Sequence, residues 1–185
     1  MDITPGPDSR SLLQFFLMSG RLKRERRRGW VKKLGMEHPE SVADHSYRTA
    51  VMAMFVSDAR GLDTGKAVRL ALLHDLPEAL VGDAMPEERS GKRKTDLETK
   101  AMEEILSELP HRSRLLYREA WLEYVEGKSE ESRLVRQLDK LEMAIQAWEY
   151  AHESGDPSKA GEFWVSAKEH IQDEELLVLL SQVEP

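Results

Sequence analysis

Cysteine is absent from the sequence, and so are long hydrophobic runs. The lack of cysteine excludes a disulfide framework and a thiolate metal site, so any metal must be bound by histidine nitrogen and carboxylate oxygen. No apolar run approaches the roughly 18 residues that a membrane-spanning helix needs. The first residues, with Asp2, Pro5 and Pro7, do not resemble a signal peptide. We therefore expect a cytoplasmic protein with no membrane partner.

Positive charge is in deficit, because 27 Lys and Arg residues stand against 34 Asp and Glu residues, for a net charge of −7. A broad nucleic-acid surface needs the opposite balance, so we expect no stable nucleic-acid partner. The charge is uneven, however, since residues 21–33 contain eight basic residues and one acid, Glu25. This stretch could bind a small anionic substrate or could be a solvated basic segment, and composition alone favours the second.

Strand-like alternation and internal repeats are lacking, whereas helix signals recur from end to end. Ser41 and Asp44 form a capping-box pattern that predicts a helix start, and an irregular connection is expected around Gly29 and Gly35. The pattern predicts an all-α fold in a single domain over residues 1–185, with a core over about 12–151. The expected helices cover residues 11–22 (starting near Asp8 or Ser9), 41–60, 64–75 (capped by Thr64), 96–109, 112–126 and 130–153. Two shorter helices are expected near Lys159 and Asp173 within 157–182, and a polar loop over 82–94.

Four ionisable residues lie on or beside the apolar faces of three expected helices. His45 and His74 follow the three- and four-residue spacing of those faces, Asp75 adjoins His74, and Asp139 lies at the border of a third face. Burying an unpaired charge is costly, but two imidazoles and two carboxylates around one divalent cation would satisfy all four groups. Such a set suits Mn²⁺, Co²⁺, Fe²⁺, Ni²⁺ or Zn²⁺ better than Ca²⁺.

Each of these residues also has a simpler interpretation. A lone inward histidine such as His45 is more often a hydrogen-bonded core residue than a ligand. Asp139 could pair with a buried arginine, and the dipeptide His74-Asp75 is common. Periodicity alone therefore leaves a metal site and an ordinary core both open.

With their neighbours, the four residues resemble the H…HD…D pattern of the HD-domain metal-dependent phosphohydrolases. Residues 39–46, 72–83 and 137–142 resemble the 5′-deoxynucleotidase branch of that superfamily, and residues 22–30 resemble the segment before its first histidine. The resemblance covers about residues 12–151. It implies a single helical HD domain, often a homodimer, that hydrolyses deoxyribonucleoside 5′-monophosphates to deoxynucleoside and phosphate. It also implies one divalent metal bound by His45, His74, Asp75 and Asp139.

Two further carboxylates would do the chemistry in such an enzyme. Glu78 follows Asp75 by three residues and would orient the attacking water or accept its proton. Asp83 would protonate the leaving 5′-oxygen, which requires a raised pKa; the two residues could also exchange these roles. The alternative is that Glu78 only favours a helix start and Asp83 only a turn.

The substrate would contact the basic stretch. Arg27 would bind the phosphate through its planar guanidinium; alignment on Gly29-Trp30 favours Arg27, with Arg28 as the alternative. Trp30 would pack against the sugar and exclude a 2′-hydroxyl, or it could be a core or loop anchor.

Two other functions compete with the deoxynucleotidase. One is an HD-domain phosphohydrolase that acts on a nucleoside triphosphate, a cyclic nucleotide or guanosine tetraphosphate. The other is a nucleic-acid-binding protein in which residues 21–33 contact the nucleic acid and the metal is structural; it would show steep salt dependence.

Overall fold

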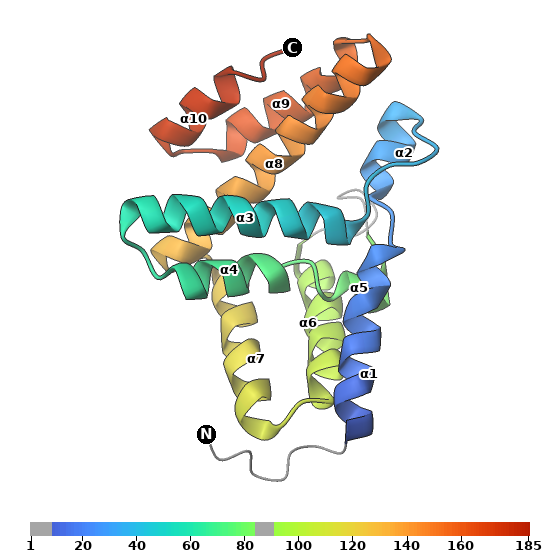
Figure 1. Ribbon diagram of the computed structural model, residues 1–185, viewed down its shortest axis with the longest axis vertical. Helices are drawn as coiled ribbons and strands as arrows, with labels where there is room; N and C mark the ends of the chain where they lie inside the picture. Colours follow the sequence, from blue (N-terminus) through green and yellow to red (C-terminus); the bar gives the residue numbers. More distant parts are fainter. Residues whose placement is uncertain (1–8, 84–90) are drawn as a thin grey trace. The chain divides into compact units, whose positions relative to one another are not determined.

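The computed structural model describes residues 9–83 and 91–185, which are helical almost throughout (Figure 1). Across these ranges the only β-type pairing is an isolated bridge between Arg26 and Ser41, so the predicted all-α fold is confirmed. In the same ranges no helix is both long and apolar enough to cross a membrane. The elements are α1 (Ser9–Ser19), η1 (Gly20–Lys23), α2 (Arg28–Leu34), α3 (Val42–Arg60), α4 (Thr64–Leu73), α5 (Glu78–Val81), α6 (Gly91–Ser107), α7 (His111–Glu126), α8 (Glu130–Ser154), α9 (Ser158–His170) and α10 (Glu174–Ser181).

The chain divides into two compact units, each built from two separate stretches of sequence. The first comprises the residues up to Ser46 together with Leu72–Glu126, and the second comprises Tyr47–Ala71 together with Gly127–Pro185. The boundaries fall inside α3 and α4. The predicted division into a core over 12–151 and C-terminal helices over 157–182 stays a prediction.

In the first unit, α1 packs against α6, and α6 pairs with α7 in a helical hairpin that turns at Pro110 (Figure 1). The short helix α5 packs against η1, α1 and α6. The buried side chains of α6 follow the spacing of one helix face, which explains why this otherwise polar helix folds onto its neighbours. They are Ala101, Met102, Ile105 and Leu106.

In the second unit, α9 packs along α8, and α10 packs on both (Figure 1). Local caps set the limits of these helices. Ser129 Oγ accepts the Ser132 N–H at the start of α8, and Gly155, at φ 66°, ends it in the left-handed conformation. Asp173 accepts the Leu176 N–H at the start of α10, and its carboxylate also binds Arg60 of α3 at 2.6 and 2.9 Å.

The structure corrects the prediction of an irregular connection around Gly29 and Gly35. Residues 28–34 form α2, which Gly35 ends at φ 63°. Its central residue, Trp30, is only 1% exposed. Burial of this large side chain stabilises a helix whose glycine and basic residues give a weak sequence signal.

The cap and the end of α4 also differ from the prediction. The cap of α4 is Asp63 rather than Thr64, because Asp63 Oδ1 accepts the Lys66 N–H at 2.9 Å. α4 ends at Leu73, two residues earlier than expected, because a turn precedes Pro77. Within the predicted polar loop over 82–94, residues 84–90 lie outside the described residues, and α6 already begins at Gly91.

Candidate metal centre

The first histidine follows directly on the capping box that starts α3. Asp44 Oδ2 accepts the Ser41 backbone N–H at 2.9 Å, and Ser41 Oγ accepts the Asp44 N–H at 3.3 Å, as the sequence predicts. This reciprocal pair fixes the first turn of the helix. His45, the next residue, is fully buried with 0% exposure.

The second histidine lies in the turn that links α4 to α5. The turn spans His74 to Pro77 and is closed by the Glu78 N–H, which donates to Asp75 O at 3.0 Å. His74 and Glu78 are buried, and the Asp75 side chain is 17% exposed. A single turn of chain therefore presents an imidazole and two carboxylates.

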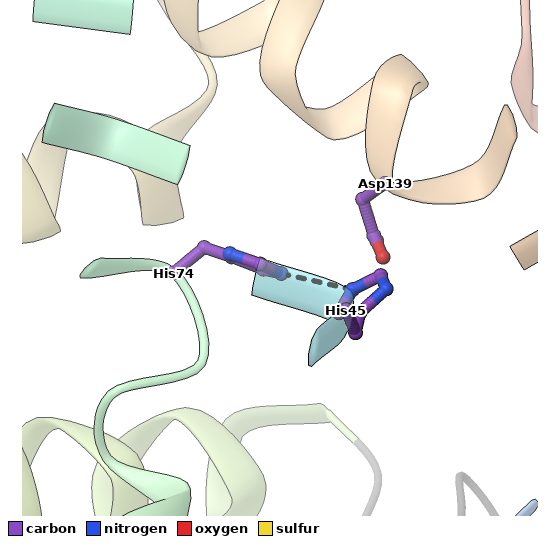
Figure 2. A group of neighbouring side chains, drawn as sticks. All are labelled: His45, His74 and Asp139. Atoms are coloured by element: carbon purple, nitrogen blue, oxygen red, sulfur yellow. Dashed lines mark hydrogen bonds between the residues drawn. The ribbon is translucent and has the colours of Figure 1, made fainter. Parts of the chain in front are cut away.

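The two imidazoles point toward one another, as Figure 2 shows, with 3.2 Å between His45 Nε2 and His74 Nε2. Asp75 Oδ2 lies 3.2 Å from His74 Nε2 and 3.7 Å from His45 Nε2. Ligand atoms that bind one ion at about 2.1 Å lie about 3.0–3.5 Å apart in tetrahedral or octahedral geometry. Two of the three separations fall in this range and the third, at 3.7 Å, is slightly longer, so this set of two nitrogens and one oxygen is close to the geometry that a divalent cation needs.

The carboxylate of Asp75 has the charge state that a metal ligand needs. Burial opposes its ionisation, but the charge and hydrogen bond of His74, with smaller effects of Arg27 and His45, hold the pKa of Asp75 below its ordinary value of 3.8. Asp75 is therefore ionised at neutral pH, as metal binding requires.

Glu78 has the opposite character. Its Oε2 is buried and has no hydrogen-bond partner among the described residues. Burial, followed by the negative charges of Asp75 and Asp83, raises the pKa of Glu78 well above its ordinary value. A buried carboxyl group of this kind can exchange a proton with a water or a substrate.

Arg27 and Arg28 have different partners. Arg27, which is 9% exposed, donates from Nη1 to Asp75 Oδ2 at 3.2 Å. Arg28 instead donates its backbone N–H to Asp83 Oδ2 at 2.5 Å. Of the two candidates, Arg27 is therefore the one that contacts Asp75, the carboxylate next to His45 and His74.

Trp30 follows Arg27 by three residues and is covered by other residues. Its indole N–H donates to Glu40 Oε1 at 2.9 Å, and the Arg27 backbone N–H donates to Glu40 O at 3.2 Å. The ring is therefore fixed next to the candidate phosphate-binding residue.

Asp139, the fourth predicted ligand, is carried by α8 of the second unit and is also drawn in Figure 2. It is 9% exposed, and its Oδ2 lies 3.0 Å from Lys140 Nζ. Its participation in metal binding stays a prediction.

Tyr124, which contacts His74, was not among the residues that the sequence analysis identified. Its ring meets that of His74 edge to face, with 5.6 Å between the centroids. The contact restricts the orientation of the imidazole. No local pattern in α7 could have revealed it, because the two residues are far apart in sequence.

Comparison with known proteins agrees with this arrangement. A family model described as the HD domain matches residues 19–177, which reach into both units. The 5′-deoxynucleotidase HDDC2 of Homo sapiens is 42% identical over 180 residues, covering 97% of this chain and 87% of that protein. The 5′-deoxynucleotidase hdd1 of Schizosaccharomyces pombe is 32% identical over 165 residues, covering 86% and 82%.

A solved structure shares the fold. The PH0347 protein of Pyrococcus horikoshii OT3 superimposes with a TM-score of 0.76 at 32% identity, covering 93% of this chain and 98% of that one. The family match, the identity to these relatives and the buried histidine–aspartate group together show that the chain belongs to the HD-domain family.

Proposed function

We propose that this chain is a metal-dependent 5′-deoxynucleotidase, which hydrolyses deoxyribonucleoside 5′-monophosphates to deoxynucleoside and phosphate. The observation that carries the proposal is the contact of Asp75 with three groups, His45, His74 and Arg27. It combines metal-binding donors with a guanidinium suited to phosphate. Relatives at 32–42% identity that bear this activity in their names support the substrate class.

The metal would be held by His45, His74 and Asp75 of the first unit, with Asp139 of the second as the fourth ligand. Nitrogen and oxygen donors of this kind accept Mn²⁺, Co²⁺, Fe²⁺, Ni²⁺ or Zn²⁺. When bound, the ion supplies positive charge that stabilises the phosphate in the transition state and acidifies a water.

Two residues of the first unit would handle the phosphate and the proton. Arg27 binds the phosphate oxygens through its planar guanidinium. Glu78 orients the attacking water, accepts its proton and delivers it to the leaving 5′-oxygen. Its buried carboxyl group and raised pKa support this role. We give Asp83 a positioning role, because its Oδ2 already accepts the Arg28 N–H.

Trp30 would support the wall that excludes a 2′-hydroxyl; because its ring is only 1% exposed, it would do so by fixing the residues that cover it. A wall that discriminates by steric contact has to be rigid, and the Trp30 ring is held by burial and by its hydrogen bond to Glu40. Replacing Trp30 with leucine should therefore raise the ratio of the rate on AMP to the rate on dAMP.

The experiment that tests the function is a substrate panel. Metal-stripped protein is incubated with dAMP, AMP, dATP and a cyclic nucleotide, each with and without Mn²⁺ or Co²⁺, and released phosphate is measured. We expect metal-dependent release that is fastest from dAMP. Faster release from AMP, or activity confined to dATP or the cyclic nucleotide, would assign the chain to another phosphohydrolase class. No release, with salt-dependent RNA or DNA binding, would favour the nucleic-acid-binding alternative.

We also propose that the chain forms a homodimer through α3. Its exposed apolar residues share one helix face and are Tyr47, Val51, Met54 and Phe55, with exposed fractions of 70%, 41%, 46% and 72%. A continuous apolar face of this kind is typical of a subunit interface. Sedimentation velocity should show a dimer that Phe55→Glu dissociates; a wild-type monomer would contradict the proposal.

A further inference from the structure

Glu25 is the one acid in the basic stretch 21–33, and neither metal binding nor phosphate binding uses it. Its side chain is half-buried, and its Oε1 accepts the backbone N–H of Asp83 at 3.1 Å, across 58 positions of sequence. Its backbone oxygen accepts the Val42 N–H at 2.9 Å, at the start of α3. Glu25 thus joins the segment before α2 to the segment after α5.

The contact is reciprocal. Asp83 Oδ2 accepts the backbone N–H of Arg28 at 2.5 Å, and Asp83 O accepts from Arg28 Nη1 at 3.4 Å. The side chain of each segment therefore binds the backbone of the other. The first N–H groups of a helix have no partner inside it, so Asp83 supplies one for α2. We call these bonds between Glu25, Asp83 and Arg28 the clasp.

Gly82 makes the close approach possible. It adopts φ 74° and ψ 158°, a conformation that side chains disfavour. A Cβ at this position would lie 3.3 Å from Glu25 Oε1. Gly82 also caps α5, because its N–H donates to Glu78 O at 2.9 Å. The clasp therefore connects the helix that begins at Glu78 to the segment that carries Arg27.

Arg27 lies between the two anchored positions, with Glu25 before it and Arg28 after it. Its guanidinium can reach Asp75 only while this stretch of backbone keeps its path. We propose that Glu25 is a positioning residue, whose clasp with Asp83 holds Arg27 in place to bind the phosphate of the substrate. This inference rests on the proposed function.

The hydrogen bond between Asp83 N–H and Glu25 Oε1 requires an acceptor oxygen on residue 25 and does not require a charge, because the donor is a backbone N–H. Glu25→Gln keeps an acceptor oxygen at that position, whereas Glu25→Ala removes it. Glu37→Ala is the matched control, since it removes the same charge from a side chain that is 88% exposed. If Glu25 served only to offset the surrounding positive charge, the Gln and Ala variants would be equally impaired.

The first readout is kinetic, with dAMP and Mn²⁺ and with inorganic phosphate as the competitive inhibitor. For Glu25→Ala we expect both the KM for dAMP and the inhibition constant of phosphate to rise about 3- to 10-fold, which corresponds to the net free-energy contribution of one ordinary hydrogen bond. We expect kcat, metal content and Tm to change little. Glu25→Gln and Glu37→Ala should stay within about twofold of wild type on the same scale.

The second readout is amide hydrogen exchange, which needs no activity and so separates this inference from the proposed function. We expect the amides of Asp83 and Arg28 to lose protection in Glu25→Ala and to keep it in Glu25→Gln. Unchanged protection in Glu25→Ala, or equal loss in both variants, would overturn the clasp. If Glu25→Ala loses this protection but its KM for dAMP is unchanged, the role of the clasp in phosphate binding is refuted. If wild type hydrolyses no nucleotide, the function fails while the exchange result still stands.

Discussion

Replacing Arg48 with alanine should destabilise the second unit more than any surface substitution. On α3, Arg48 donates from Nε to Glu142 Oε1 at 2.9 Å, from Nη1 to Glu149 Oε2 at 2.8 Å, and from Nη2 to Gln146 Oε1 at 2.6 Å. The Glu142 side chain is 0% exposed and that of Arg48 is 28% exposed. The substitution deprives a fully buried carboxylate of the cation that it faces.

The magnitude follows from this burial. Removing one partner of a buried ion pair costs about 3–5 kcal/mol, and we expect about 3 kcal/mol here because the guanidinium keeps some contact with solvent. For a chain of this size that cost lowers Tm by about 6–12 °C. Burial opposes the charge of Arg48, but the hydrogen bond of Glu149 and the charge of Glu142 raise the pKa of Arg48 above its ordinary value. The loss should therefore be the same across neutral and alkaline pH.

The control is Glu149→Gln, on the more exposed side of the same guanidinium. The Glu149 side chain is 39% exposed, so the loss should not exceed about 1 kcal/mol, or about 2–4 °C in Tm. Arg48→Lys should fall between the two, since lysine lacks the fork that reaches several acceptors. The assay is denaturant and thermal unfolding at fixed metal concentration. A loss in Arg48→Ala no larger than in Glu149→Gln would refute the reasoning.

Three further predictions concern the site and α10. Asp75→Ala should abolish the rise in Tm that added metal causes. In wild type the corresponding stabilisation is about 2.7 kcal/mol at a metal concentration of 100 times Kd. A rise in Tm that persists in the variant would exclude Asp75 as a ligand. Glu78→Gln should lower kcat about 10²- to 10⁴-fold with metal content unchanged, and an unaltered kcat would rule out proton transfer by Glu78. Asp173→Ala should cost about 1–2 kcal/mol in unfolding experiments. Because the hydrogen bond from Arg60 lowers the pKa of Asp173, the part of this cost that depends on the carboxylate charge should be complete above pH 3.8 and be lost as the pH falls through the folded pKa; a constant cost down to pH 2 would contradict it.

The sequence predicted what depends on local signals. The capping box at Ser41 and the periodic apolar face of α3 are contained within one helix, so the start of α3 and the inward direction of His45 could be inferred correctly. The same holds for α8, whose predicted start at Glu130 agrees with the structure because Ser129 caps it.

The sequence could not predict what depends on distant partners. α2 begins where Asp83, far along the chain, binds its first N–H, and it persists because Trp30 is buried. Neither contact leaves a pattern near residue 28. Alignment on Gly29-Trp30 favoured Arg27 over Arg28, but the sequence alone could not show which guanidinium reaches Asp75, because the path of the backbone decides this. Local signals thus indicate the candidate ligands, and tertiary contacts determine which groups surround them.

The interleaving of the two units constrains how the chain can fold during synthesis. Residues 47–71 leave the ribosome before residues 72–126. However, Arg48 and Lys66 in this early segment form ion pairs with residues of α8, which is synthesised after residue 126. At about 5–20 residues per second, this early segment waits several seconds for its partners. During that interval the α3 residues that are buried in the folded chain, such as Ala50 and Ala53, are open to chaperones, and slower translation of residues 72–126 would lengthen that exposure.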